Sequence, residues 1–166
     1  MASLMLRVSP LKSIQIFGLW DQPRSIVMWN DIKQHTWYKL RKEFKFEPED
    51  LQILQPDKQE WIKRGNLKLW DCQEMIMFPV NPYEDLDADL ADVFSMEWTV
   101  DQWVQMGITY EQMKSRGLTP QIMKMMCFTL ADWAKLRMLP EHVTAEIARL
   151  YNVDVPECQQ ILKDYA

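Results

Sequence analysis

The chain has 166 residues, of which 48% are hydrophobic and 26% charged, a composition typical of one globular domain or two small ones. Its four glycines fall well below the roughly 7% of an average chain, which excludes a Gly-rich phosphate loop and a dinucleotide fingerprint. The net charge of −5 disfavours general nucleic-acid binding, because phosphate neutralisation supplies most of the non-specific affinity.

The first eighty residues mix short β-like and helical patterns. Segments 13–17 and 25–29 favour strands and flank a turn-like stretch, which predicts a small β-hairpin near the N-terminus. Over 31–65 a polar residue precedes a large one by four positions in three places, which predicts degenerate helical units. These pairs are Thr36 with Leu40, Glu47 with Leu51 and Asp57 with Trp61, with Asn30 as a further cap and Gly65 as a stop. Residues 67–70 are predicted as a third short strand.

Prolines and asparagine near residue 80 mark a boundary between two regions. Residues 1–80 form the predicted N-terminal α+β region and carry 12 Lys/Arg against 10 Asp/Glu. Residues 81–166 form the predicted helical repeat region and carry 7 Lys/Arg against 14 Asp/Glu. At its start, Leu86, Leu90, Val93 and Phe94 follow helical spacing among carboxylates, which predicts one acidic amphipathic helix.

A ten-residue period is the clearest pattern in the second region. A large apolar residue precedes each of four equally spaced threonines, and a second one follows each threonine by four positions. The threonines are Thr99, Thr109, Thr119 and Thr129, and the following residues are Trp103, Met113, Met123 and Trp133. Threonine can cap a helix, and Pro120 suits a first helical position. Gly107 and Gly117 suit the left-handed residue that ends a helix.

The period predicts a mainly α protein whose C-terminal half is an array of short capped helices. Helices of about seven residues are not stable alone in water, so they must pack side by side as repeat proteins do. The alternative is two longer amphipathic helices in which the threonines recur by chance.

The rows around 106–123 and 128–138 resemble short helical repeats, with a Gly-apolar-Thr core, found in structural proteins of large nucleocytoplasmic DNA viruses. The resemblance covers residues 95–140, with Cys127 and Arg137 standing where glycine is expected. It implies a virion or assembly protein that acts by contact, and it carries no catalytic residue.

Chemistry-bearing residues are few and do not form a recognisable site. The two histidines, His35 and His142, lack a zinc-binding partner spacing. Cys127 lies in an apolar run and is predicted to be buried and inert, and a Cys72–His35 nucleophile pair would need an accident of folding. We therefore expect no catalytic residue, no metal, no small-molecule ligand and no cofactor, and the chain is interpreted as a non-enzyme.

The three cysteines are widely spaced, which favours a reducing compartment over a disulfide framework. The N-terminal apolar stretch is too short for a signal peptide, and no apolar run is long enough to span a membrane. We therefore expect an intracellular location, or the virion if the protein is viral.

Two charged segments invite a binding interpretation. The carboxylates of 84–92 could hold a cation, but they lack the glycine and terminal glutamate of a calcium loop, so a solvated helix face explains them better. The basic stretch 33–45 carries Lys39, Arg41, Lys42 and Lys45 among aromatic residues. It favours contact with an acidic protein surface over phosphate binding.

Twelve methionines and eight tryptophans exceed what a rigid core of this size needs. Trp20, Trp29 and Trp70 lie outside the clear repeat and are interface candidates, together with the four basic residues of 33–45. The sequence therefore predicts a structural or assembly protein, such as a minor capsid protein, whose partners are other protein subunits. The alternative is a nucleic-acid-binding accessory protein that uses 33–45.

Overall fold

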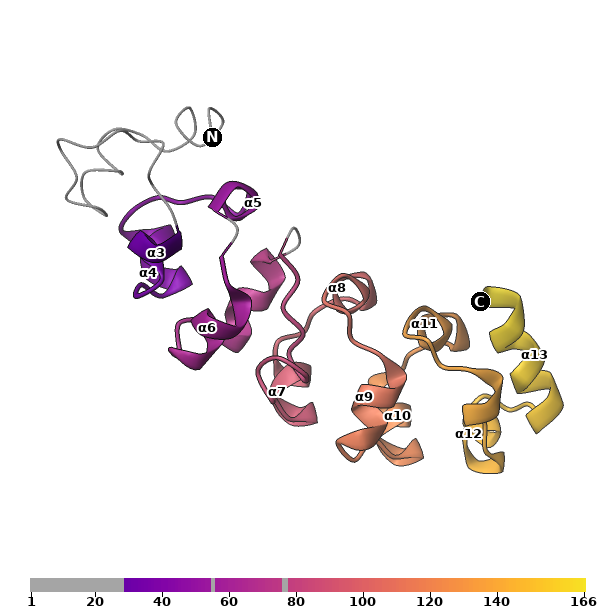
Figure 1. The fold of residues 1–166 in the computed structure, drawn as a ribbon. Helices are drawn as coiled ribbons and strands as arrows, with labels where there is room; N and C mark the ends of the chain where they lie inside the picture. Colours follow the sequence, from indigo (N-terminus) through magenta and orange to yellow (C-terminus); the bar gives the residue numbers. More distant parts are fainter. Residues whose placement is uncertain (1–28, 55, 76–77) are drawn as a thin grey trace, which may run out of the picture. The chain divides into compact units, whose positions relative to one another are not determined.

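The computed structural model describes residues 29–54, 56–75 and 78–166, and within these ranges it contains helices and turns but no strand (Figure 1). The predicted mainly α class is confirmed. Contacts divide the chain into two compact units, Met1–Val80 and Asn81–Ala166, which are described separately below.

Short helices and one 3-10 helix make up the described part of the first unit. They are α3 (Trp29–Ile32), α4 (Trp37–Lys42), α5 (Asp50–Leu54), α6 (Lys58–Lys63) and the 3-10 helix η2 (Leu69–Glu74). The Thr36 hydroxyl caps α4 by accepting from the Lys39 N–H at 3.0 Å, and the Asp57 carboxylate caps α6 through the Glu60 N–H at 3.1 Å.

Three tryptophans form the centre of this unit. Trp61 is fully buried, and its ring meets those of Trp29 and Trp37 edge-on at centroid distances of 5.2 and 6.2 Å. The Trp61 indole N–H donates to the carbonyl of His35 at 2.8 Å. The aromatic cluster thus joins α3, α4 and α6. None of these helices is long enough to be stable alone, so this packing is needed to stabilise them.

Three predictions for the first unit need correction or fall outside the described residues. The predicted hairpin falls almost wholly on residues 1–28, which lie outside the described ranges; Trp29, at its end, begins a helix. Asn30 lies within α3 and does not precede it, so it is not the cap. The predicted strand 67–70 is wrong: the Asp71 carboxylate accepts from the Lys68 N–H at 2.7 Å, and this bond closes the first turn of η2.

The second unit is a succession of short helices. They are α7 (Leu90–Ser95), α8 (Val100–Gln105), α9 (Tyr110–Ser115), α10 (Pro120–Met126), α11 (Leu130–Lys135), the 3-10 helix η3 (Pro140–His142), α12 (Ala145–Leu150) and α13 (Val155–Tyr165). No described helix runs through Gly107 or Gly117, so the alternative of two longer helices is wrong.

Side-chain caps define where these helices begin. Each of the four threonines in the ten-residue period accepts, through its hydroxyl, a backbone N–H three residues on, at 3.1 to 3.3 Å. In three of the four units the third residue is Gln or Asp, whose side chain accepts in turn from the threonine N–H, forming a capping box. The helices therefore start one residue after Thr99, Thr109, Thr119 and Thr129.

The period extends further than the threonines show. Asp89 caps α7 ten residues before Thr99, so the predicted acidic helix begins only at Leu90 and does not include Leu86. The segment that contains η3 makes the spacing from Thr129 to the next helix cap, Thr144, five residues longer than the period. The period then resumes, with Thr144 and Asp154 as the caps of α12 and α13. Aspartate serves as well as threonine because its carboxylate also favours the positive end of the helix dipole.

A left-handed residue lies two positions before each helix cap of the second unit except Thr144, which follows η3. Gly107 and Gly117 adopt it with φ of 78° and 97°, and non-glycine residues adopt it elsewhere in the array. These are Asp87 at 52°, Glu97 at 55°, Cys127 at 57°, Arg137 at 63° and Asn152 at 57°. The turn lets the next N–H bond back to the preceding helix, as Ile108 does to the carbonyl of Trp103 at 3.0 Å.

The two kinds of turn residue predict opposite responses to substitution. Gly117→Ala should lower the free energy of unfolding by about 1 kcal/mol, because a side chain is strained at positive φ although nothing lies within 4 Å of the new Cβ. Arg137→Gly should raise it by up to about 1 kcal/mol, because it relieves the same strain. Urea denaturation measures both, with Lys114→Ala on the exposed face of α9 as the control. Changes of the same sign at Gly117 and Arg137 would contradict the strain argument.

Asp71 predicts a pH dependence of stability. Burial raises the pKa of its carboxyl from 3.8 to about 6, against the opposing bond from the Lys68 N–H and with the aid of nearby Glu74. The folded chain therefore binds this proton more tightly than the unfolded chain does, so the contribution of Asp71 to stability falls as the pH rises from about 4 to 6.

Asp71→Asn keeps an acceptor for the Lys68 N–H and removes the titration. The variant should gain about 2 to 3 kcal/mol relative to the parent chain between pH 4 and pH 7, in proportion to the pKa shift. Denaturant titrations across this range measure the difference, and a constant difference would contradict the buried-acid account.

Candidate functional site

An apolar groove lies in the second unit and is formed mainly by α7, α8 and α10. It has a volume of about 910 Å³ and is open to solvent. We call it the α7–α10 groove; the apolar residues that shape it include Leu90, Phe94, Trp98, Ile122, Met125 and Phe128. Among the described residues that line it, Glu97 is the only charged one.

A row of aromatic rings forms the floor of the groove. Trp103 is 2% exposed, and its ring lies 5.9 Å from that of Phe94 and 5.2 Å from that of Phe128. Phe128 lies in turn 5.3 Å from Trp133, which is fully buried. Residues from the α7, α8 and α11 units thus share one core, and the groove is its solvent-facing side.

Hydrogen bonds hold the core beneath the groove in place. The Trp133 indole N–H donates to the Tyr151 hydroxyl at 2.7 Å, and that hydroxyl donates to the carbonyl of Phe128 at 2.9 Å. Burial raises the pKa of Tyr151 to about 12, so the hydroxyl keeps the proton that it donates. Phe128 therefore has a fixed backbone position at the edge of the groove.

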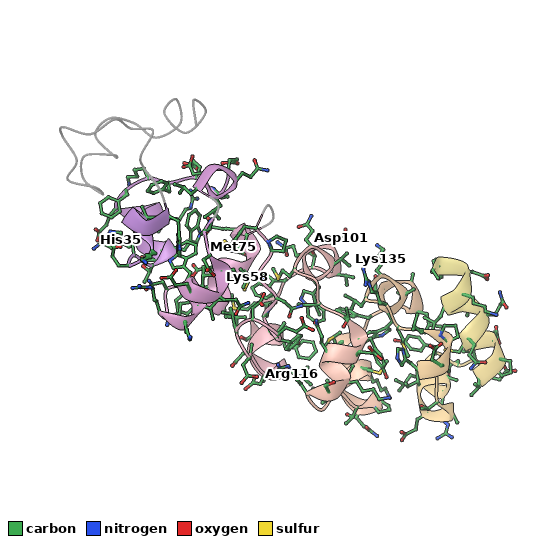
Figure 2. The ribbon with its side chains drawn as sticks, viewed as in Figure 1. His35, Lys58, Met75, Asp101, Arg116 and Lys135 are labelled. Atoms are coloured by element: carbon green, nitrogen blue, oxygen red, sulfur yellow. The ribbon has the colours of Figure 1, made fainter. Side chains whose placement is uncertain are left out.

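The segment before α7 is anchored by two polar side chains. Buried Asn81 donates to the Gly107 carbonyl at 2.8 Å and accepts from the Tyr83 N–H at 2.9 Å. Arg116, labelled in Figure 2, donates to the Tyr83 carbonyl at 2.6 Å and pairs with Asp87 at 2.8 Å. These bonds position α7, and so they fix one wall of the groove against α8 and α9.

Methionine gives the other wall an adaptable surface. Met123 faces the core and is 2% exposed, whereas Met125, two residues on, is 82% exposed. An unbranched thioether side chain suits a contact surface because it adjusts to irregular shapes. Met125 lies next to the other apolar residues of the groove, and contiguous exposed apolar patches commonly mark contact surfaces.

No protein family, curated protein or solved structure matches this chain.

The structure separates the predicted interface tryptophans. Trp20 lies outside the described residues. Trp29 belongs to the scaffold, because its indole N–H donates to Glu60 at 3.3 Å and its ring packs on Trp61. Trp70 on η2 is 53% exposed, so it remains an interface candidate.

The predicted basic residues divide in the same way. Arg41 is tied within its own unit, because its guanidinium pairs with Glu74 at 2.7 Å and with Glu47 at 2.9 Å. Lys42 and Lys45 are exposed, and Lys39 is half-exposed, with its ammonium 4.0 Å from Glu43. Burial, and secondarily Lys39, lower the pKa of His35, so His35 adds no charge near neutral pH.

The predicted repeat residues lie where the period expects them. Trp103, Met113, Met123 and Trp133 are all at most 2% exposed, and their four threonines are caps at the surface of the unit. Cys127 corrects one expectation: it is exposed, because its left-handed backbone places it in the turn after α10. Cys72 and Cys158 are buried.

Within residues 29–54, 56–75 and 78–166, no group of His, Cys, Asp or Glu could hold a metal ion. His142 instead has a structural contact, since its Nδ1 accepts from the Leu139 N–H at 2.8 Å. None of the helices described here is long and apolar enough to cross a membrane.

The groove was not predicted from the sequence, although the spacing of its apolar residues indicates it. Leu90 and Phe94 are four residues apart on α7, as are Ile122 and Met126 on α10. Each helix already supplies one fully buried residue, Val93 or Met123, and its second apolar pair lines the groove. A helix with two apolar faces indicates a contact surface beyond the core.

Trp103 and Met125 should separate scaffold from surface. Trp103→Ala should cost about 3 to 5 kcal/mol, because it leaves a cavity in the aromatic row. Met125→Ala should change the free energy of unfolding by less than about 0.5 kcal/mol, because its side chain is exposed. Denaturant unfolding compares the two. A large loss of stability in Met125→Ala would show that Met125 belongs to the core.

Proposed function

We propose that this chain is a non-enzymatic structural or assembly protein that acts through protein–protein contacts at the α7–α10 groove. The observation that carries the proposal is an apolar groove of about 910 Å³ with an 82% exposed methionine on one wall and an ordered aromatic floor. Grooves of this kind take amphipathic or aromatic segments of other proteins.

The resemblance of residues 95–140 to repeats in structural proteins of large DNA viruses supports a place in a virion or its assembly, as a minor capsid protein for example. A repeat array suits that role because its stability comes from neighbouring units, which leaves outward faces available for contact. The proposed partners are other protein subunits, met in a reducing compartment or in the particle.

The ion pairs made by the basic stretch 33–45 favour protein over nucleic acid as the partner. Arg41 is held by two carboxylates of its own unit, and Lys33 pairs with Glu60 at 3.1 Å. Phosphate binding needs several cations that remain available to release counterions. The acidic second unit adds repulsion towards a polyanion.

Site-specific photo-crosslinking tests the proposal. A photoreactive benzoyl-phenylalanine at Met125 should crosslink to protein in cells that make the chain, whereas the same residue at exposed Lys163 on α13 should not. Mass spectrometry of the adducts, and of particles purified from the same cells, identifies the partner. Equal crosslinking at both positions, or adducts with nucleic acid alone, would overturn the proposed function.

A further inference from the structure

An aromatic ring surrounded by lysines stands out on the exposed face of α4 in the first unit. Tyr38 is 58% exposed, and the Lys42 ammonium lies 5.9 Å from its ring centroid. Lys39 precedes Lys42 by three residues on α4, and its ammonium lies 4.0 Å from the Glu43 carboxylate and 5.9 Å from the Phe44 ring centroid. We call Tyr38, Lys39 and Lys42 the α4 face.

The α7–α10 groove has the complementary character. Its lining is apolar apart from Ser95 and the carboxylate of Glu97. Asp92 on α7 is exposed and directly follows the lining residue Ala91, and Asp101 on α8 is exposed with its carboxylate 3.6 Å from the Lys135 ammonium (Figure 2). The second unit carries twice as many acidic as basic residues. The groove therefore favours an apolar anchor that is flanked by positive charge.

We propose that the α7–α10 groove binds the α4 face of a second copy of this chain. Tyr38 enters the apolar groove, and Lys39 and Lys42 lie against the carboxylates at its edge. This inference rests on the proposed function, and it names the partner of the same groove.

The two surfaces lie in different units, and each copy offers one groove and one α4 face. Made in one direction only, such contacts give rings or open filaments, and made reciprocally by two copies they give a closed symmetric pair. Charge attraction contributes to the encounter and is screened by salt, whereas burial of the Tyr38 ring is not. Self-association should therefore weaken with salt without being abolished.

Two complementary variants test the contact by sedimentation velocity of the full chain. The α4 variant carries Tyr38→Ser and Lys42→Glu, and the groove variant carries Ala91→Lys and Met125→Lys. All four positions are exposed. Circular dichroism of each variant serves to check that it folds. Matched controls make the same charge changes elsewhere: Gln59→Ser with Lys63→Glu on α6, and Ala145→Lys with Gln160→Lys on α12 and α13.

Each variant alone should be monomeric at concentrations where the parent chain and both controls associate, with affinity reduced about tenfold or more. An equimolar mixture should form a one-to-one dimer, because the α4 variant keeps its groove and the groove variant keeps its α4 face. A monomeric mixture, or association of either variant as strong as that of the parent, overturns the proposal.

The outcome is separable from that of the proposed function. A parent chain that stays monomeric while Met125 crosslinks to a different protein overturns self-association and leaves the contact function standing. A monomeric chain without groove-specific crosslinks overturns both.

Discussion

One hydrogen bond, from a backbone N–H to a threonine or aspartate oxygen three residues earlier, sets the start of nearly every helix in the second unit. A helix of six residues gains too few backbone bonds to offset the cost of nucleation. The cap satisfies one of its orphaned N–H groups, and the left-handed residue at the other end redirects the chain. Packing against neighbouring units provides the remaining stability.

Because caps, turns and one core residue define each unit, the array can carry a binding surface as well. Each unit needs one large side chain for the core, such as Trp103 or Met123, and the caps fix the helix ends independently of it. Further apolar residues on α7 and α10, such as Leu90 and Met125, line the groove. They gather at the groove because the shared aromatic row of Phe94, Trp103 and Phe128 lies beneath them.

The local features of the fold could be predicted from the sequence. Each unit has its cap, its core residue four positions later and its glycine stop within ten residues. The roles of Thr99 as a cap and Trp103 as a core residue can therefore be predicted without knowledge of the tertiary structure. Aspartate caps such as Asp89 use the same chemistry, but a search for threonine alone overlooks them. Cys127 and Arg137 occupy left-handed turns that their residue types alone do not indicate, although the ten-residue period places them where glycine is expected.

The non-local features could not be predicted in this way. The groove combines residues of α7 and α10, which are about thirty positions apart, and its wall depends on bonds from Asn81 and Arg116 to distant backbone groups. The prediction of a strand over 67–70 was wrong because a strand also depends on distant residues. The segment has no partner strand within the described residues, and Asp71 favours a turn. Exposed Tyr38 and buried Trp37 are neighbours in sequence, so only the packing separates a contact residue from a core residue.

Native-state hydrogen exchange, followed residue by residue by NMR, tests most directly whether capped ten-residue units build this fold. The account predicts strong and similar protection for the N–H groups that close each turn, those of Ile108, Leu118 and Met138, because cap, turn and core open together. Exchange of these three groups at the rate of an unstructured peptide, while the helix interiors stay protected, would contradict it.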